Sequence, residues 1–224
     1  TITIDAGVYV VAGQLVIDSN TCDLTVLGAT NKDGTPATTL VPGAGNSNRC
    51  LLVTDACGGN LVENIIIEQF SGGSAGQAIN VYSSTATFNN CIVRNNISTS
   101  QVVVYVDNAC SDCEVEFTQC VFEGNIGPDA GVFRVNYAGS TTFDGCTFIG
   151  NESTVDGPGV GLLDYTDMHM IDCLLEGNIG LYGGALQKID GQVGGARGRN
   201  NVFGTTSKSY AWVMILMWPW RYAK

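Results

Sequence analysis

The sequence predicts an all-β protein, a parallel β-helix of about seven coils, because one motif recurs at a nearly fixed period. A cysteine followed five residues later by an asparagine occurs four times, and successive cysteines are 29, 26 and 27 residues apart. The intervening runs are rich in Val, Ile, Phe and Thr and are bounded by Gly, Asn, Asp and Ser, the composition of strands and turns. No run of ten or more residues has the apolar spacing of an amphipathic helix.

Equivalent residues of successive coils stack at about 4.8 Å, so the motif predicts two internal columns. We expect the cysteines to pack inward as reduced thiols and the asparagines to bond to each other and to the backbone at a bend. The sequons at Asn96 and Asn151 are therefore expected to stay unmodified. The cysteine column is Cys91, Cys120, Cys146 and Cys173, and the asparagine column is Asn96, Asn125, Asn151 and Asn178.

The repeat weakens toward both ends of the chain. Residues 24–28 look like a first copy and residues 201–204 like a last one, which predicts a single β-helix domain over residues 1–205. Residues 206–224 form an atypical tail whose apolar run of ten residues, 211–220, is too short to span a bilayer. We expect it either to cap the open end of the last coil or to be a foreign terminus. Because the chain begins with Thr and not Met, we expect a mature or excised segment.

Several short elements resemble the repeats of bacterial polymorphic outer-membrane proteins. Residues 122–125 and 148–151 match their Phe-x-x-Asn element, and residues 183–186 match their Gly-Gly-Ala-(Ile/Leu/Val) element. The resemblance implies a right-handed, pectin-lyase-like β-helix. The rule for parallel crossover connections predicts the same hand.

Composition limits the classes of partner. The net charge is −11 and no basic patch is present, which excludes nucleic-acid binding and attraction to anionic membranes. Low charge with many Ser, Thr, Asn and Gly is typical of secreted or cell-surface proteins, so we expect an extracellular or cell-surface location.

The cysteines outside the column lie in loop-like sequence. Cys50 with Cys57, and Cys110 with Cys113, are the disulfide candidates, and such staples would place the protein in an oxidising compartment. A redox or zinc role for Cys110 and Cys113 is the alternative, but no second pair or His partner accompanies them. We therefore expect no cofactor and no metal.

An alignment of the apolar runs predicts one outward polar row. Its side chains suggest either a plain surface ion pair between Arg134 and Asp164 or a shallow strip in which Tyr105 stacks on a sugar ring. The row is Asn80, Tyr105, Arg134, Asp164 and Gln187.

No catalytic residue is predicted. Enzymes of the pectin-lyase-like type use acidic calcium ligands with a base, or a cluster of Asp residues, and the single histidine, His169, stands alone between methionines. The sequence thus favours a non-enzymatic module with a structural, adhesive or glycan-contacting role, whose partner is a polysaccharide or a surface protein. The alternative is a polysaccharide lyase or glycoside hydrolase that acts on acidic polysaccharide.

Overall fold

The structure is a computed structural model, and within the residues that it describes every element is a strand or a turn. Residues 187–189, 196–199 and 202–203 are described by their backbone only. The described residues are 1–21, 23–55, 58–107, 112–136, 139–155, 157–164, 166, 168–181, 185–189, 196–199 and 202–203.

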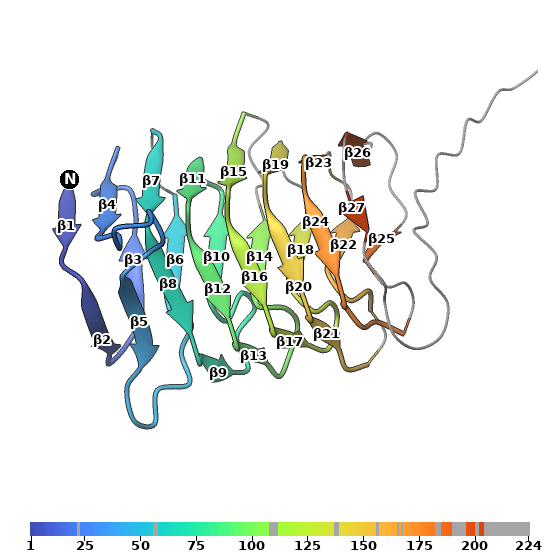
Figure 1. Cartoon of the computed structure of the whole chain (residues 1–224), viewed down its shortest axis with the longest axis horizontal. Coiled ribbons are helices and arrows are strands. Elements are labelled where there is room, and N and C mark those ends of the chain that lie inside the picture. Colours follow the sequence, from blue (N-terminus) through green and yellow to red (C-terminus); the bar gives the residue numbers. More distant parts are fainter. Residues whose placement is uncertain are drawn as a thin grey trace, which may run out of the picture.

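Three long parallel sheets and one short sheet wrap around a common axis (Figure 1). Sheet A contains β1 (Ile2–Ile4), β4 (Thr25–Gly28), β7 (Asn60–Glu63), β11 (Ala86–Asn89), β15 (Glu114–Thr118), β19 (Ser140–Asp144), β23 (Met168–Ile171) and β26 (Ala196–Arg199). Sheet B contains β2 (Gly7–Val11), β5 (Thr38–Pro42), β8 (Ile65–Glu68), β12 (Ile92–Arg94), β16 (Val121–Glu123), β20 (Thr147–Ile149), β24 (Leu174–Glu176) and β27 (Val202–Phe203).

Each coil then closes through sheet C. It contains β3 (Leu15–Ile17), β6 (Leu51–Thr54), β10 (Ile79–Tyr82), β14 (Val104–Asp107), β18 (Phe133–Asn136), β22 (Gly161–Asp164) and β25 (Leu186–Ile189). A short sheet between B and C contains β9 (Ser71–Gly72), β13 (Ile97–Ser98), β17 (Ile126–Gly127) and β21 (Glu152–Ser153).

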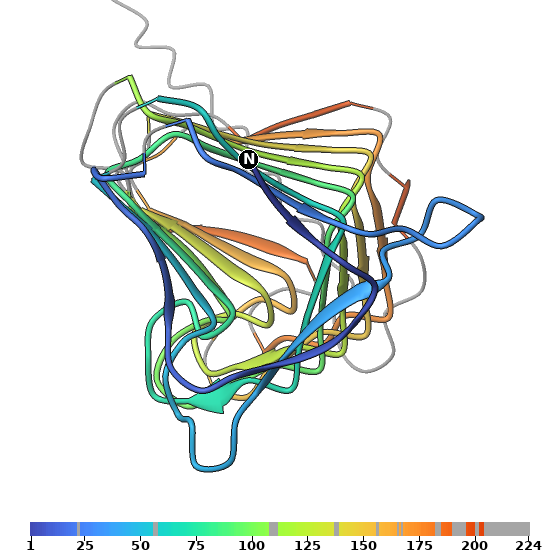
Figure 2. The ribbon, with the colours of Figure 1, turned by 90° about the vertical axis from the view of Figure 1, so that its left-hand side faces the viewer.

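The architecture confirms the predicted fold. Every pair of neighbouring strands is parallel and in register, and the number of strands per sheet agrees with the expected number of coils. Seen from the N-terminal end in Figure 2, the chain runs clockwise as it recedes, which is a right-handed coil. The tail of residues 206–224 lies outside the described residues, so its boundary and its role as a cap stay predictions.

Two bends use left-handed backbone in five successive coils, from the coil with β7 and β8 to the coil with β23 and β24. One column of residues with φ between 47° and 62° separates sheet A from sheet B, and a second, with φ between 53° and 66°, follows sheet B. In the second column three of the five residues are glycines, which adopt this conformation without steric cost and thus explain the Gly before three of the four motif asparagines. The second column is Gln69, Asn95, Gly124, Gly150 and Gly177.

The asparagine column forms a continuous buried ladder. Asn125 Nδ2 donates to Asn151 Oδ1 at 3.1 Å and to the carbonyl of Val93 at 2.8 Å, while the backbone N–H of Asn125 donates to the same Asn151 oxygen at 3.0 Å. Asn96 and Asn151 repeat this pattern with the next coil, and all four asparagines are at most 1% exposed. The ladder is therefore confirmed, and both sequon asparagines are enclosed by it.

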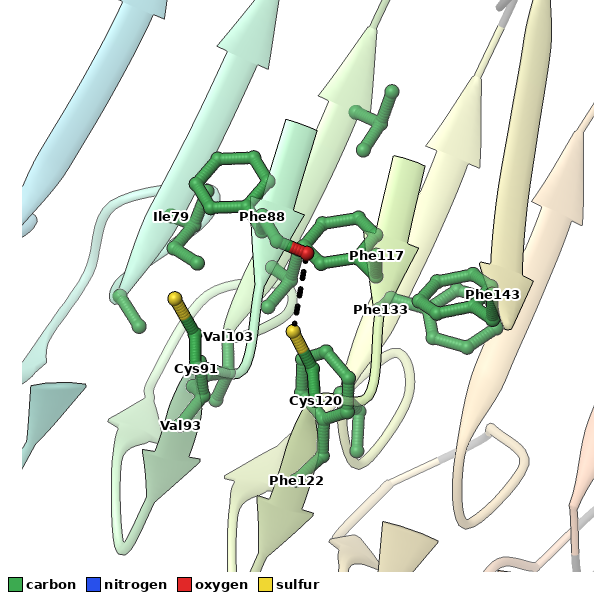
Figure 3. Packing of buried hydrophobic residues seen from close by; sticks show 14 of the residues in the cluster. Ile79, Phe88, Cys91, Val93, Val103, Phe117, Cys120, Phe122, Phe133 and Phe143 are labelled. Atoms are coloured by element: carbon green, nitrogen blue, oxygen red, sulfur yellow. Dashed lines mark hydrogen bonds between the residues drawn. The ribbon is translucent and has the colours of Figure 1, made fainter. Parts of the chain in front are cut away.

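The cysteine column is confirmed as four buried thiols that form no disulfide. Each Sγ donates to a backbone carbonyl of the preceding coil, as Cys120 does to Phe88 O at 3.3 Å (Figure 3). Burial and the neighbouring thiols raise the pKa of Cys120, so its thiol stays protonated. Beside the thiols the rings of Phe88 and Phe117 stack at 4.8 Å and those of Phe117 and Phe143 at 5.0 Å.

The predicted Cys50–Cys57 disulfide is wrong. Cys50 is a free thiol, fully buried in the core beside the start of β6, and burial raises its pKa. The polar residues before Cys50 suggested an exposed loop, but the side chain of Cys50 is buried in the core. Cys57 and Cys110 lie outside the described residues, so the Cys110–Cys113 pairing stays a prediction.

Replacing Asn151 with Ala tests the ladder. The substitution removes the acceptor for two N–H groups of Asn125 and the donor to Phe122 O, all in a dry interior. We expect the free energy of unfolding to fall by about 1–3 kcal/mol in denaturant titrations. Asn20→Ala, at an exposed turn, is the control and should change it by less than about 0.5 kcal/mol. Equal losses for the two variants would contradict the ladder's role.

Candidate functional site

The outward face of sheet C carries the predicted polar residues in two parallel rows. Strand register places residues of successive coils directly beside one another, and alternate residues of each strand point outward. The first row is Leu52, Asn80, Tyr105, Arg134 and Leu162. The second row is Thr54, Tyr82, Asp107, Asn136 and Asp164.

The prediction that Asp164 belongs to the first row is wrong. Asp164 is the register partner of Asn136, and Leu162 stands beside Arg134 instead. Asn80, Tyr105 and Arg134 do share a row, as expected, and the backbone of Gln187 continues it.

Gly161 explains this two-residue shift. It lies opposite Phe133, and a Cβ at Gly161 would stand 2.1 Å from atoms of the Phe133 ring. The ring of Phe133 fills that space and stacks on Phe143 at 4.6 Å. Aligning the strands by apolar character placed Leu163 opposite Phe133, because a glycine in that column gives no apolar signal.

Arg134 is held by two carboxylates. Its Nη2 lies 3.2 Å from Asp164 Oδ2, which confirms the predicted ion pair between adjacent coils as a diagonal contact. Its Nη1 lies 3.3 Å from Asp129 Oδ2, from the connection between β17 and β18. Sequence reasoning missed Asp129, because nothing in the repeat indicates how that connection folds back onto sheet C.

Tyr105 is fixed in place by hydrogen bonds. Its hydroxyl donates to Asp107 Oδ2 at 3.3 Å and accepts from Asn136 Nδ2 at 3.2 Å. Burial, with the charge of Asp107, raises the pKa of Tyr105, and burial also raises the pKa of Asp107 against the opposing effects of the Tyr105 bond and of Arg134. The predicted stacking residue is thus a partly buried member of a polar cluster.

Tyr82 offers the more accessible ring. It is 45% exposed and is the register partner of Asp107 in the second row. The sequence analysis did not identify Tyr82, because its alignment took only one outward residue from each strand. The period of two along the strand, applied from Asn80, would have found it.

The first row is largely covered by the connections that precede sheet C. Asn80 is only 6% exposed, and its Nδ2 donates to the carbonyl of Ala75 at 3.1 Å. Val102 and Ala130 from later connections pack against Leu162. The second row is therefore the part of the predicted site that can meet a ligand.

The cluster also has unused hydrogen-bonding capacity. In the described part of the chain, Arg134 Nε, Asn136 Oδ1 and Asp164 Oδ1 are buried atoms without a partner. Buried polar groups in proteins usually have one, often a bound water.

The single histidine of the chain lies on another sheet. His169 is on β23 of sheet A, beside Thr142, and does not belong to the cluster. Among the described residues no three His, Cys, Asp or Glu side chains are arranged to hold a metal ion. The same residues contain no helix with the length and apolarity needed to cross a bilayer.

Gly161→Ala tests the register. Its methyl group would overlap the Phe133 ring, so we expect a loss of about 1–3 kcal/mol in the free energy of unfolding, as for an overpacked core. Gly59→Ala, where a methyl group meets no atom within 4 Å, is the control. A melting temperature unchanged by Gly161→Ala would contradict the packing of Phe133 on this glycine.

Asp107→Asn tests the buried carboxylate. Because the folded chain raises the pKa of Asp107, ionisation lowers stability at neutral pH, and this effect disappears once the pH is below the pKa of the unfolded chain. Asn keeps an oxygen acceptor for Tyr105. The variant should therefore melt above the wild type at pH 7, with the difference shrinking toward about pH 3. A difference that grows as the pH falls would show that the sign is wrong; Asp5→Asn, at an exposed site, is the control.

Comparisons of the chain with protein-family models, with curated proteins and with solved structures find no match. The fold therefore rests on the observed pairing and register of the strands, and function must be argued from the outward face of sheet C.

Proposed function

We propose that the chain is a non-enzymatic module of an extracellular or cell-surface protein and that the second row of sheet C contacts a glycan. One observation carries the proposal: an exposed tyrosine ring, Tyr82, lies beside the side chains of Asp107, Asn136 and Asp164 on successive coils. Sugar rings present C–H faces that pack on aromatic rings and hydroxyl groups that both donate and accept hydrogen bonds. The row offers both kinds of contact.

The scaffold suits a repeating ligand. Row members are separated by the coil spacing of about 4.8 Å, which is close to the length of one sugar unit along a polysaccharide. The asparagine ladder and the stacked rings beneath hold these positions rigidly, so little conformational entropy is lost on binding. A structural or adhesive role is compatible with the same surface, and its partner would be a polysaccharide or a glycosylated surface protein.

The state of Arg134 supports a binding role over lyase chemistry. A lyase base must give up its own proton before it can abstract one from the substrate. Two carboxylates within 3.3 Å stabilise the protonated guanidinium of Arg134 and occupy it. We also propose a pectin-lyase-like affiliation, supported by the phenylalanines and asparagines of the motif, which stack in separate internal columns.

A glycoside hydrolase is the second candidate, favoured by the spacing of two carboxylates. Asp107 and Asp164 flank Asn136 in one row, so they lie two coils, or about 9.5 Å, apart. This is the upper part of the range of inverting hydrolases, and a carboxyl with a raised pKa, as at Asp107, suits a general acid. Release of reducing ends from a polysaccharide, abolished by Asp107→Asn, would replace the binding proposal with this one.

Tyr82→Ala tests the binding proposal. Against a panel of neutral, amino-bearing and acidic oligosaccharides, we expect at least one class to bind and the variant to weaken that binding about tenfold, because the ring face is lost. Isothermal titration calorimetry measures the dissociation constants of the wild type and the variant. Tyr9→Ala, an exposed tyrosine on sheet B, should bind as the wild type does. Binding by no class, or equal binding by both variants, would contradict the proposal.

A further inference from the structure

We infer that the ligand of the second row is a glycan that carries free primary amino groups, with an ammonium group held between the carboxylate of Asp107 and the ring of Tyr82. The inference rests on the proposed function and adds the charge of the ligand to it.

The first step is the charge balance of the cluster. Asp107, Asp129 and Asp164 bring three carboxylates, and among the described side chains Arg134 brings the one cation that contacts any of them. Asp129 and Asp164 share that guanidinium, whereas Asp107 makes no ion pair within the described residues and bonds only to the Tyr105 hydroxyl. The cluster is thus an unbalanced anionic site on a chain whose net charge is already −11.

The second step is the position of Tyr82. It faces Asp107 across neighbouring strands β10 and β14, at a spacing of about 4.8 Å. An ammonium group at this point can contact the electron-rich face of the ring and, at the same time, form an ion pair with the carboxylate. Asn136 stands on the next coil beside Asp107 and continues the row with a polar side chain.

The third step excludes the other charge classes. An acidic glycan would bring carboxylates against Asp107 and Asp164, and like charges at this separation repel. A neutral glycan would cover Asp107 without compensating its charge, which costs desolvation free energy. Burial raises the pKa of Asp107 in the free protein, although the hydrogen bond from Tyr105 and the charge of Arg134 both lower it.

The experiment compares three oligosaccharides of equal length by calorimetry: glucosamine oligomers, the same oligomers fully N-acetylated, and galacturonic acid oligomers. We expect the amino form to bind roughly tenfold or more tightly than the N-acetylated form, since the two differ only in the charge and the acyl group. Asp107→Asn should remove that preference, because the amide carries no charge to pair with an ammonium group. Asp5→Asn, an exposed carboxylate on the first coil, is the control and should retain the preference.

The outcomes separate the inference from the proposed function. Equal or tighter binding of the N-acetylated or acidic oligomers overturns the inference and leaves the glycan-binding proposal standing. If Asp107→Asn and Asp5→Asn lose the preference for the amino form equally, the preference reflects general attraction of a polycation to an acidic chain. That result also overturns the inference. If no oligomer binds, the glycan-binding proposal is contradicted, and the inference is overturned with it. Circular dichroism of both variants establishes that each is folded, and Tyr82→Ala, which keeps every carboxylate, provides a second test of the same site.

Discussion

The amide-to-amide hydrogen bond between stacked asparagines is the interaction on which the rest of this structure depends. Asn125 and Asn151, within the ladder, each accept two N–H groups of the preceding coil with the side-chain oxygen. The side-chain nitrogen of each donates both to the next asparagine and to a backbone carbonyl. Every bond is buried, so a coil displaced by one residue would leave several polar groups unpaired in a dry interior. The ladder thereby fixes the register of neighbouring coils.

Register in turn determines what the outside of the molecule presents. Because strands alternate inward and outward residues, the register that buries Phe133 beside Gly161 also places Asn136 beside Asp164 on the surface. The polar cluster of sheet C is then completed by the connection that carries Asp129. Its two rows differ in access, since the connections cover the first row and leave Tyr82 open. A ligand-binding surface on this fold is thus a consequence of interior packing.

The sequence was sufficient to predict the columns and the parallel pairing, because the motif repeats the same side chains at positions where a substitution is costly. The right hand was predicted from the rule for parallel crossover connections. It was not sufficient for the details of the site. Gly161 has no side chain to reveal its column, and the connection that carries Asp129 belongs to no repeat. Cys50 was assigned to a disulfide from its polar neighbours, although its own side chain points into the core. Such errors arise wherever tertiary packing, and not local composition, decides the environment of a residue.

Hydrogen exchange of the backbone amides of Asn96, Asn125 and Asn151 tests the central claim most directly, because these N–H groups donate to side chains of the neighbouring coil and to no strand of a sheet. If the ladder fixes the register, these amides should exchange only through global unfolding, as slowly as the central strands of sheet B. Exchange at the rate of the exposed turns, while sheet B stays protected, would show that the coils keep their register without the ladder.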